Sequence, residues 1–114
     1  MVEKQKFKYT LHAKYDRSER EKFIEENIGF GEFRDEFEVD NNHPNGTEIH
    51  KVTSTALIFV FNKRTQRLIT MFVASPNRIQ RLYLTAKKKA PQDIIEKAIE
   101  NRDKGFYQKA RDLH

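Results

Sequence analysis

The side chains in this sequence that could do chemistry are those that handle phosphate without a metal ion. They occur in three strand-like segments: His50 and Lys51, then Thr70, and then Arg78, Arg81 and Tyr83. Cleavage of RNA by its own 2′-hydroxyl needs a base, an acid for the departing oxygen, and cations that stabilise the charged transition state. Arg78 and Arg81 point to opposite faces of a regular strand, so a bulge or a strand end is required for both to serve one site.

Each of these residues also has an ordinary structural explanation. A lone histidine in a strand is more often a surface or edge residue than a catalyst. The ring of Tyr83 could belong to the core. Arg78 and Arg81 could pair with acids from the first half of the chain, at modest benefit. Residue types alone therefore leave catalytic and structural roles open.

Charge is distributed unevenly along the chain, which has a net charge of +5. The segment from Lys14 to Asp40 is acidic, whereas no acid occurs between Glu48 and Asp93. One-signed charge over a folded stretch favours a polyanionic partner, although many small basic proteins have none. Besides Arg81, the basic residues expected to contact nucleic acid are Lys51, Lys63, Arg64, Arg67, Arg78, Lys87, Lys88 and Lys89.

Motifs for other chemistries are weak or missing. The chain has no cysteine, which excludes disulfides, thiol nucleophiles and thiolate metal sites. Its histidines show no metal-ligand spacing. The segment from Asp40 to Glu48 resembles a calcium loop only superficially, because Pro44 occupies a ligand position and Asn45 stands where glycine is needed. We expect neither a metal nor a cofactor.

The length of 114 residues is that of a single domain spanning residues 1–114. The longest apolar run, Ala56 to Phe61, is too short to cross a bilayer, and the first residues are polar. We therefore expect a cytoplasmic protein without a membrane partner. The sequence leaves the oligomeric state open.

Hydrophobic periodicity predicts an α+β fold. Ser18 or Asp16 can cap a helix from about Arg17 to Asn27, which Gly29 would end. Pro91 fits the first turn of a second helix, carrying Ile94, Ile95, Ala98 and Ile99 on one face and ending at Gly105, with a short helical extension after it.

Strand-like segments lie between these helices. Phe33 to Val39 and Thr47 to Thr53 alternate around turn residues, and Ala56 to Asn62 and Arg67 to Ala74 form the clearest hairpin. Arg78 to Leu84 alternates as a further strand after a turn at Ser75, and Phe7 to Leu11 fits either a short strand or a helix start. We predict an antiparallel sheet of four to five strands with an N-terminal helix and a C-terminal helix.

The strand half of the chain resembles small phage-encoded proteins of the barnase, EndoU, colicin and RelE-like nuclease superfamily. The resemblance lies in the segments Glu48–Thr53, Leu57–Thr65, Arg67–Met71 and Arg78–Tyr83. Members of that superfamily pack one or two N-terminal helices on a four-stranded antiparallel sheet, and many cleave RNA without a metal. The resemblance implies that His50 is an acid or base, Thr70 a substrate-positioning hydroxyl, and Arg81 with Tyr83 a phosphate-binding and proton-transfer pair.

The sequence thus predicts an RNA-binding protein with metal-independent endoribonuclease activity as its possible chemistry. Two alternatives stay open: a module that binds nucleic acid without cutting it, and an interaction or inhibitor protein whose basic face meets an acidic protein. Exposed aromatic rings for base stacking would favour the first alternative. The available aromatic residues are Phe30, Tyr83 and Tyr107.

Overall fold

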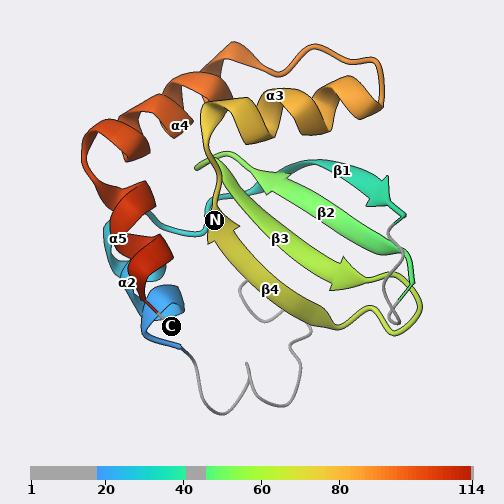
Figure 1. The fold of residues 1–114 in the computed structure, drawn as a ribbon, viewed down its shortest axis with the longest axis horizontal. Helices are drawn as coiled ribbons and strands as arrows, with labels where there is room; N and C mark the ends of the chain where they lie inside the picture. Colours follow the sequence, from blue (N-terminus) through green and yellow to red (C-terminus); the bar gives the residue numbers. More distant parts are fainter. Residues whose placement is uncertain (1–17, 41–45, 114) are drawn as a thin grey trace.

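Four antiparallel strands form one sheet in the order β1-β2-β3-β4 (Figure 1). The computed structural model describes residues 18–40 and 46–113. The strands are β1 (Phe33–Val39), β2 (Glu48–Thr53), β3 (Leu57–Asn62) and β4 (Leu68–Val73). Each strand pairs with the next one along the chain. Both predicted hairpins are therefore confirmed, whereas the segment from Phe7 to Leu11 lies outside the described residues.

Short-range hydrogen bonds shape the two turns that flank β3. The hydroxyl of Thr53 accepts a hydrogen bond from the amide of Leu57, which closes the turn between β2 and β3. On the other side, Oδ1 of Asn62 accepts from the amide of Thr65. All six residues of β3 are buried, as expected for a central strand with both faces covered.

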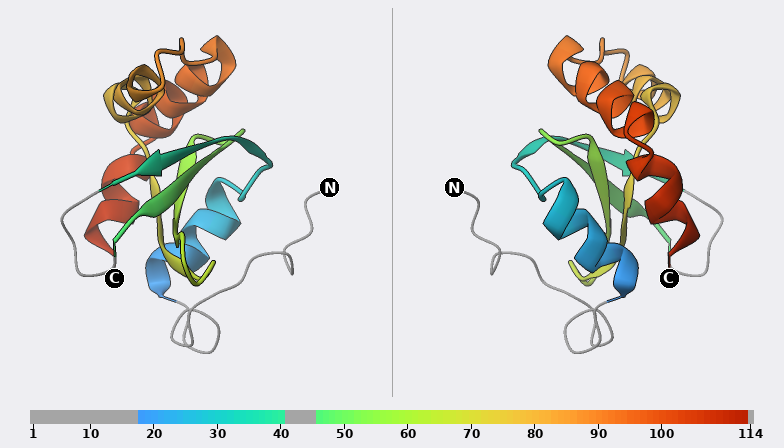
Figure 2. Two further views of the ribbon diagram at one scale, coloured as in Figure 1. Left: turned by 90° about the vertical axis from the view of Figure 1, so that its right-hand side faces the viewer. Right: turned by 90° about the vertical axis from the view of Figure 1, so that its left-hand side faces the viewer.

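The two faces of the sheet carry separate hydrophobic clusters. Phe59 packs in one cluster with Ile24 of α2 (Glu19–Asn27) and Ala110 of α5 (Phe106–Asp112). Ile58 packs in the other, with residues of α3 (Pro76–Thr85) and α4 (Gln92–Asp103). Figure 2 shows α3 and α4 over one end of the sheet. Phe59 is therefore buried in the cluster that joins the sheet to the first helix.

The predicted helices form close to their expected ends. Ser18 caps α2 by accepting a hydrogen bond from the amide of Glu21, and the left-handed Gly29 follows the helix. Pro91 is the N-cap of α4, and Gly105 separates α4 from α5. No helix within the described residues is long and apolar enough to span a membrane.

The prediction of a strand from Arg78 to Leu84 is wrong, because this segment forms most of helix α3. Ser75 is the N-cap and accepts a hydrogen bond from the amide of Arg78, while Pro76 occupies the first turn. These are favourable positions for serine and proline at a helix start. The helix buries Ile79, Leu82 and Tyr83, which share one face at helical spacing. In the sequence, residues 78–84 also fit the alternation of a strand, which concealed the helical spacing of the buried residues.

Candidate functional site

His50 and Thr70 lie in one cross-strand row. His50 pairs with Val60 of β3, and Val60 pairs with Thr70 of β4. Residues paired in this way point to the same face of a sheet, here the face that α3 and α4 cover in part. Because one strand separates them, their Cα atoms are roughly 10 Å apart. His50, the expected acid or base, and Thr70, the expected substrate-positioning hydroxyl, thus lie on one face of the sheet.

A carboxylate holds the imidazole of His50. Nε2 lies 3.0 Å from Oε1 of Glu48, which stands two residues earlier and therefore on the same face of β2. The histidine is only 7% exposed. This contact orients the ring and forms an ion pair whenever the imidazole is protonated.

Thr70 is held from outside the sheet by Arg20. Nη2 of Arg20 donates a hydrogen bond of 3.1 Å to Oγ1 of Thr70. Arg20 lies in the first turns of α2, and β4 is an edge strand, so the guanidinium reaches Thr70 around that edge. Nε of Arg20 is buried and has no hydrogen-bond partner in the described part of the chain.

Tyr83 is a core residue whose hydroxyl is already engaged. Its ring packs edge-on against Phe37, with 4.7 Å between centroids, and is 1% exposed. Its hydroxyl donates a 2.6 Å hydrogen bond to Oδ2 of Asp35. Burial, followed by the contact with Asp35, raises the pKa of Tyr83 well above its usual value. In this arrangement the proton of Tyr83 serves a hydrogen bond between α3 and β1.

Arg81 lies on the outer side of α3, away from the sheet. Residues two positions apart on a helix do not face each other, and Tyr83 belongs to the buried face. Arg81 instead lines a shallow groove with Asn77, Gln80 and the exposed Leu84. The structure therefore does not bring Arg81 and Tyr83 together on one surface. The expected pairing depended on a strand that does not form.

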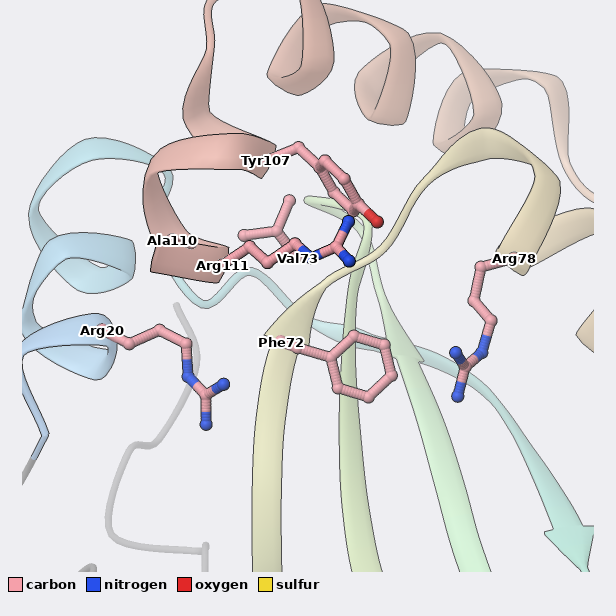
Figure 3. Close-up of a pocket in the computed structure, with 7 residues that line it drawn as sticks. All are labelled: Arg20, Phe72, Val73, Arg78, Tyr107, Ala110 and Arg111. Carbon is pink, nitrogen blue, oxygen red and sulfur yellow. The ribbon is translucent and has the colours of Figure 1, made fainter. Parts of the chain in front are cut away.

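Three arginines from different helices line a pocket beside β4 (Figure 3). They are Arg20 of α2, Arg78 of α3 and Arg111 of α5, and the pocket volume is about 320 Å³. The Arg78 guanidinium carbon lies 5.0 Å from the centroid of the Phe72 ring, which is a cation–π distance. The remaining lining residues are Val73, Tyr107 and Ala110.

The described residues that line this pocket make it positively charged. None of them carries a carboxylate. Within residues 18–40 and 46–113, no acid lies within ion-pairing distance of Arg20, Arg78 or Arg111. A guanidinium presents N–H groups in a planar fork that matches the oxygens of phosphate. The arrangement can bind a phosphoryl group.

Sequence reasoning found Arg78 but missed Arg20 and Arg111. Arg20 is surrounded by acids in the sequence, and Arg111 lies near the end of the chain. Neither position carries a motif, and their approach depends on where α2 and α5 pack beside β4. The sequence therefore did not assign either arginine to a site.

The predicted basic residues do not form one continuous surface. Lys51 contacts Glu36 at 3.8 Å and lies over the rings of Phe33 and Phe61, on the face opposite His50. Lys63 pairs with Glu38 at 3.0 Å. The acidic strand β1 thus compensates part of the basic stretch.

Two groups of basic residues make no ion pair with any acid that the structure describes, and these groups lie apart from each other. Arg64 and Arg67 belong to the connection between β3 and β4, while the three lysines belong to the connection between α3 and α4 (Figure 1). Arg78 lies between these groups in the chain and lines the arginine pocket. The three lysines are Lys87, Lys88 and Lys89.

The aromatic residues named as stacking candidates differ in accessibility. Phe30 and Tyr83 are buried, whereas Tyr107 is half-buried and lines the arginine pocket. In the described part of the chain, no three histidine, aspartate or glutamate side chains gather as a metal site would require. Comparison with known proteins finds no matching family model, curated protein or solved structure.

Proposed function

We propose that this protein binds RNA or another single-stranded nucleic acid, and that Arg20, Arg78 and Arg111 hold its phosphate. The observation that carries the proposal is that these arginines, from three separate helices, line one pocket to which no described residue contributes a carboxylate. Phosphate contacts supply most of the sequence-independent affinity for nucleic acids. The function proposed is therefore binding, with the pocket as its centre.

Two further features support a nucleic acid over a small anion. Tyr107 and Phe72 place aromatic surface in the pocket lining, and bases stack on such surfaces with little dependence on sequence. The exposed basic groups at Arg64 and Arg67 and at Lys87–Lys89 add positive potential that attracts a polyanion. An acidic protein partner would use the same charges but would gain nothing from base stacking.

A salt titration of RNA binding tests this proposal. Fluorescence anisotropy with a labelled single-stranded RNA should show affinity that falls steeply with salt, each neutralised phosphate adding about 0.7 to the slope of log K against log salt. Arg111→Ala and Arg78→Ala should each flatten the slope by about that amount. Arg102→Ala is the matched control, because it removes an equal charge from the exposed face of α4, where Arg102 contacts Asp103.

The Arg102→Ala control and RNA binding at low salt decide whether the proposal holds. If Arg102→Ala weakens binding as much as Arg111→Ala, the pocket is not the binding site. If RNA does not bind at low salt, the nucleic-acid proposal fails, and capture of an acidic protein becomes the expected behaviour of the basic groups.

Metal-independent RNA cleavage is a second candidate function, favoured by the position of His50 and Thr70. Both lie in one row of the sheet, and Thr70 accepts a hydrogen bond from Arg20, which lines the pocket. A phosphate held by Arg20 would therefore lie near the hydroxyl of Thr70. His50, whose ring contacts Glu48, lies in the same row two strands away. Arg81 and Tyr83 give this candidate less support. Arg81 lies on the outer side of α3, and Tyr83 is buried in the core.

A further inference from the structure

We infer that the arginine pocket takes a phosphomonoester at the end of an RNA strand, in preference to the phosphodiesters within the strand. The inference rests on the proposed function, because it names which phosphate of the nucleic acid the pocket receives. The relevant geometry is the placement of Arg20 and Arg78 on opposite sides of the Phe72 ring, with Arg111 of α5 lining the same pocket (Figure 3).

The number of charges in the pocket exceeds what a phosphodiester can use. A phosphodiester carries a single negative charge, whereas a terminal phosphate carries about −1.5 to −2 at neutral pH and offers an additional acceptor oxygen. Arg20 donates one N–H to Thr70, and the guanidinium of Arg78 lies over the ring of Phe72. Most N–H donors of the three arginines are therefore available to a ligand. The pocket therefore matches the more highly charged group.

The shape of the pocket favours a strand end. Helix α5 borders it with Tyr107, Ala110 and Arg111, while Arg20 and Arg78 approach from α2 and α3 on opposite sides (Figure 3). A strand that passes through must enter and leave on different sides, but a strand end only needs to enter. At about 320 Å³, the pocket lies at the small end of ligand sites and suits one terminal group better than several nucleotides.

The fixed position of Arg20 indicates a prepared donor. Its Nη2 donates to Thr70, and its buried Nε has no hydrogen-bond partner among residues 18–40 and 46–113. Unpaired buried donors are rare in proteins, and a bound anion compensates the charge of such a guanidinium. The contact with Thr70 holds the guanidinium plane before the ligand arrives, which reduces the entropy lost on binding.

The test compares RNAs of one sequence that differ only at their ends. Four probes serve: a 5′-phosphate, a 3′-phosphate, hydroxyls at both ends, and the corresponding nucleoside monophosphate as a competitor. We expect one phosphorylated RNA to bind at least about tenfold more tightly than the hydroxyl form, which corresponds to about 1.4 kcal/mol. The preferred end identifies the source of the phosphomonoester.

Matched variants locate the preference. Arg111→Ala should reduce the affinity for the phosphorylated RNA to that of the hydroxyl form, whereas Arg102→Ala should keep the difference. The preference should also decrease as the pH falls below about 6, where the terminal phosphate loses its second charge. Thermal unfolding of each variant verifies that the exposed substitutions leave the fold intact.

Four results would overturn the inference in distinguishable ways. Equal, Arg111-dependent affinity for phosphorylated and hydroxyl RNA would refute it while the proposed function stands. A preference that Arg111→Ala leaves unchanged would place the terminal phosphate elsewhere. Absence of binding by every RNA at low salt would refute both proposals, and displacement of RNA by inorganic phosphate as efficiently as by the monophosphate would reduce the site to one for free phosphate.

Discussion

The hydroxyl of Tyr83 donates a 2.6 Å hydrogen bond to Oδ2 of Asp35 and thereby joins helix α3 to strand β1. Next to it, Arg34 of β1 contacts Asp93 of α4 at 2.8 Å, so the same strand is tied to both helices on this face. The contact lowers the pKa of Asp93 and raises that of Arg34. Tyr83, which the sequence suggested for proton transfer, thus serves to join α3 to β1.

Tyr83→Phe should change the alkaline stability of the protein. Burial raises the folded-state pKa of Tyr83 above its usual value of about 10. The stability that it contributes is therefore complete below about pH 10 and is lost as the pH rises, at up to about 1.4 kcal/mol per pH unit. Tyr83→Phe should remove this part of the decline and should cost about 1 kcal/mol at neutral pH, since the hydrogen bond to Asp35 is lost.

Denaturant unfolding at neutral and alkaline pH measures both effects. Tyr107→Phe is the control, because its half-buried ring lies in the pocket lining and leaves the bond between Tyr83 and Asp35 intact. Identical alkaline slopes for the parent protein and Tyr83→Phe would contradict the assignment.

Phe59→Ala should destabilise the protein by about 3–5 kcal/mol, because the ring is fully buried in the cluster that joins the sheet to α2 and α5. Ile69→Ala, on the adjacent strand, removes a side chain that is 37% exposed and should cost much less. The difference between the two midpoints of urea unfolding measures the effect. Similar losses for the two variants would show that Phe59 is not a central core residue.

Ser75→Ala should cost about 1 kcal/mol, because it removes the hydroxyl that accepts from the amide of Arg78 and leaves the first turn of α3 without its cap. Ser75→Asp should retain the stability, because aspartate is an equally good N-cap. Equilibrium unfolding of both variants provides the measurement. If Ser75→Asp is as unstable as Ser75→Ala, the serine acts by some means other than capping.

His50→Gln and His50→Ala test the second candidate function. If His50 is the acid or base, RNA cleavage proceeds in the presence of a chelator, leaves 2′,3′-cyclic phosphate ends and falls by about 10²–10⁴ in both variants. In both variants, the pH profile of the cleavage rate should lose the part that depends on protonation of His50. Loss of stability alone does not produce this change.

Arg81→Ala is the geometric control for this experiment. Arg81 lies on the outer side of α3, so its removal should leave cleavage nearly unchanged. A fall as large as that of His50→Ala would show that the two residues act at one site. Intact RNA after incubation with the parent protein, together with salt-dependent binding, would leave binding as the function.

Much of the fold was predictable because its signals are local. The hairpin of β3 and β4, the cap at Ser18 and the stops at Gly29 and Gly105 follow from periodicity and backbone preferences within a few residues. Helix α3 is the instructive exception. Ile79, Leu82 and Tyr83 satisfy helical spacing while Ile79 and Tyr83 also satisfy alternation, and the decision depended on the Ser75 cap and on burial against the sheet.

The candidate site was less predictable, because contacts between distant residues define it. His50 and Thr70 share a face through the register of β2, β3 and β4. Alternation did not specify that register, because β3 is apolar and buried on both faces. The meeting of Arg20, Arg78 and Arg111 depends on where three helices pack around one strand edge. Periodicity, capping residues and charge can be read along the chain. The sequence alone therefore determined most helices and strands and the excess of positive charge. Packing decides which side chains face one another, so only the tertiary structure separated Arg81 from Tyr83 and assembled the arginine pocket.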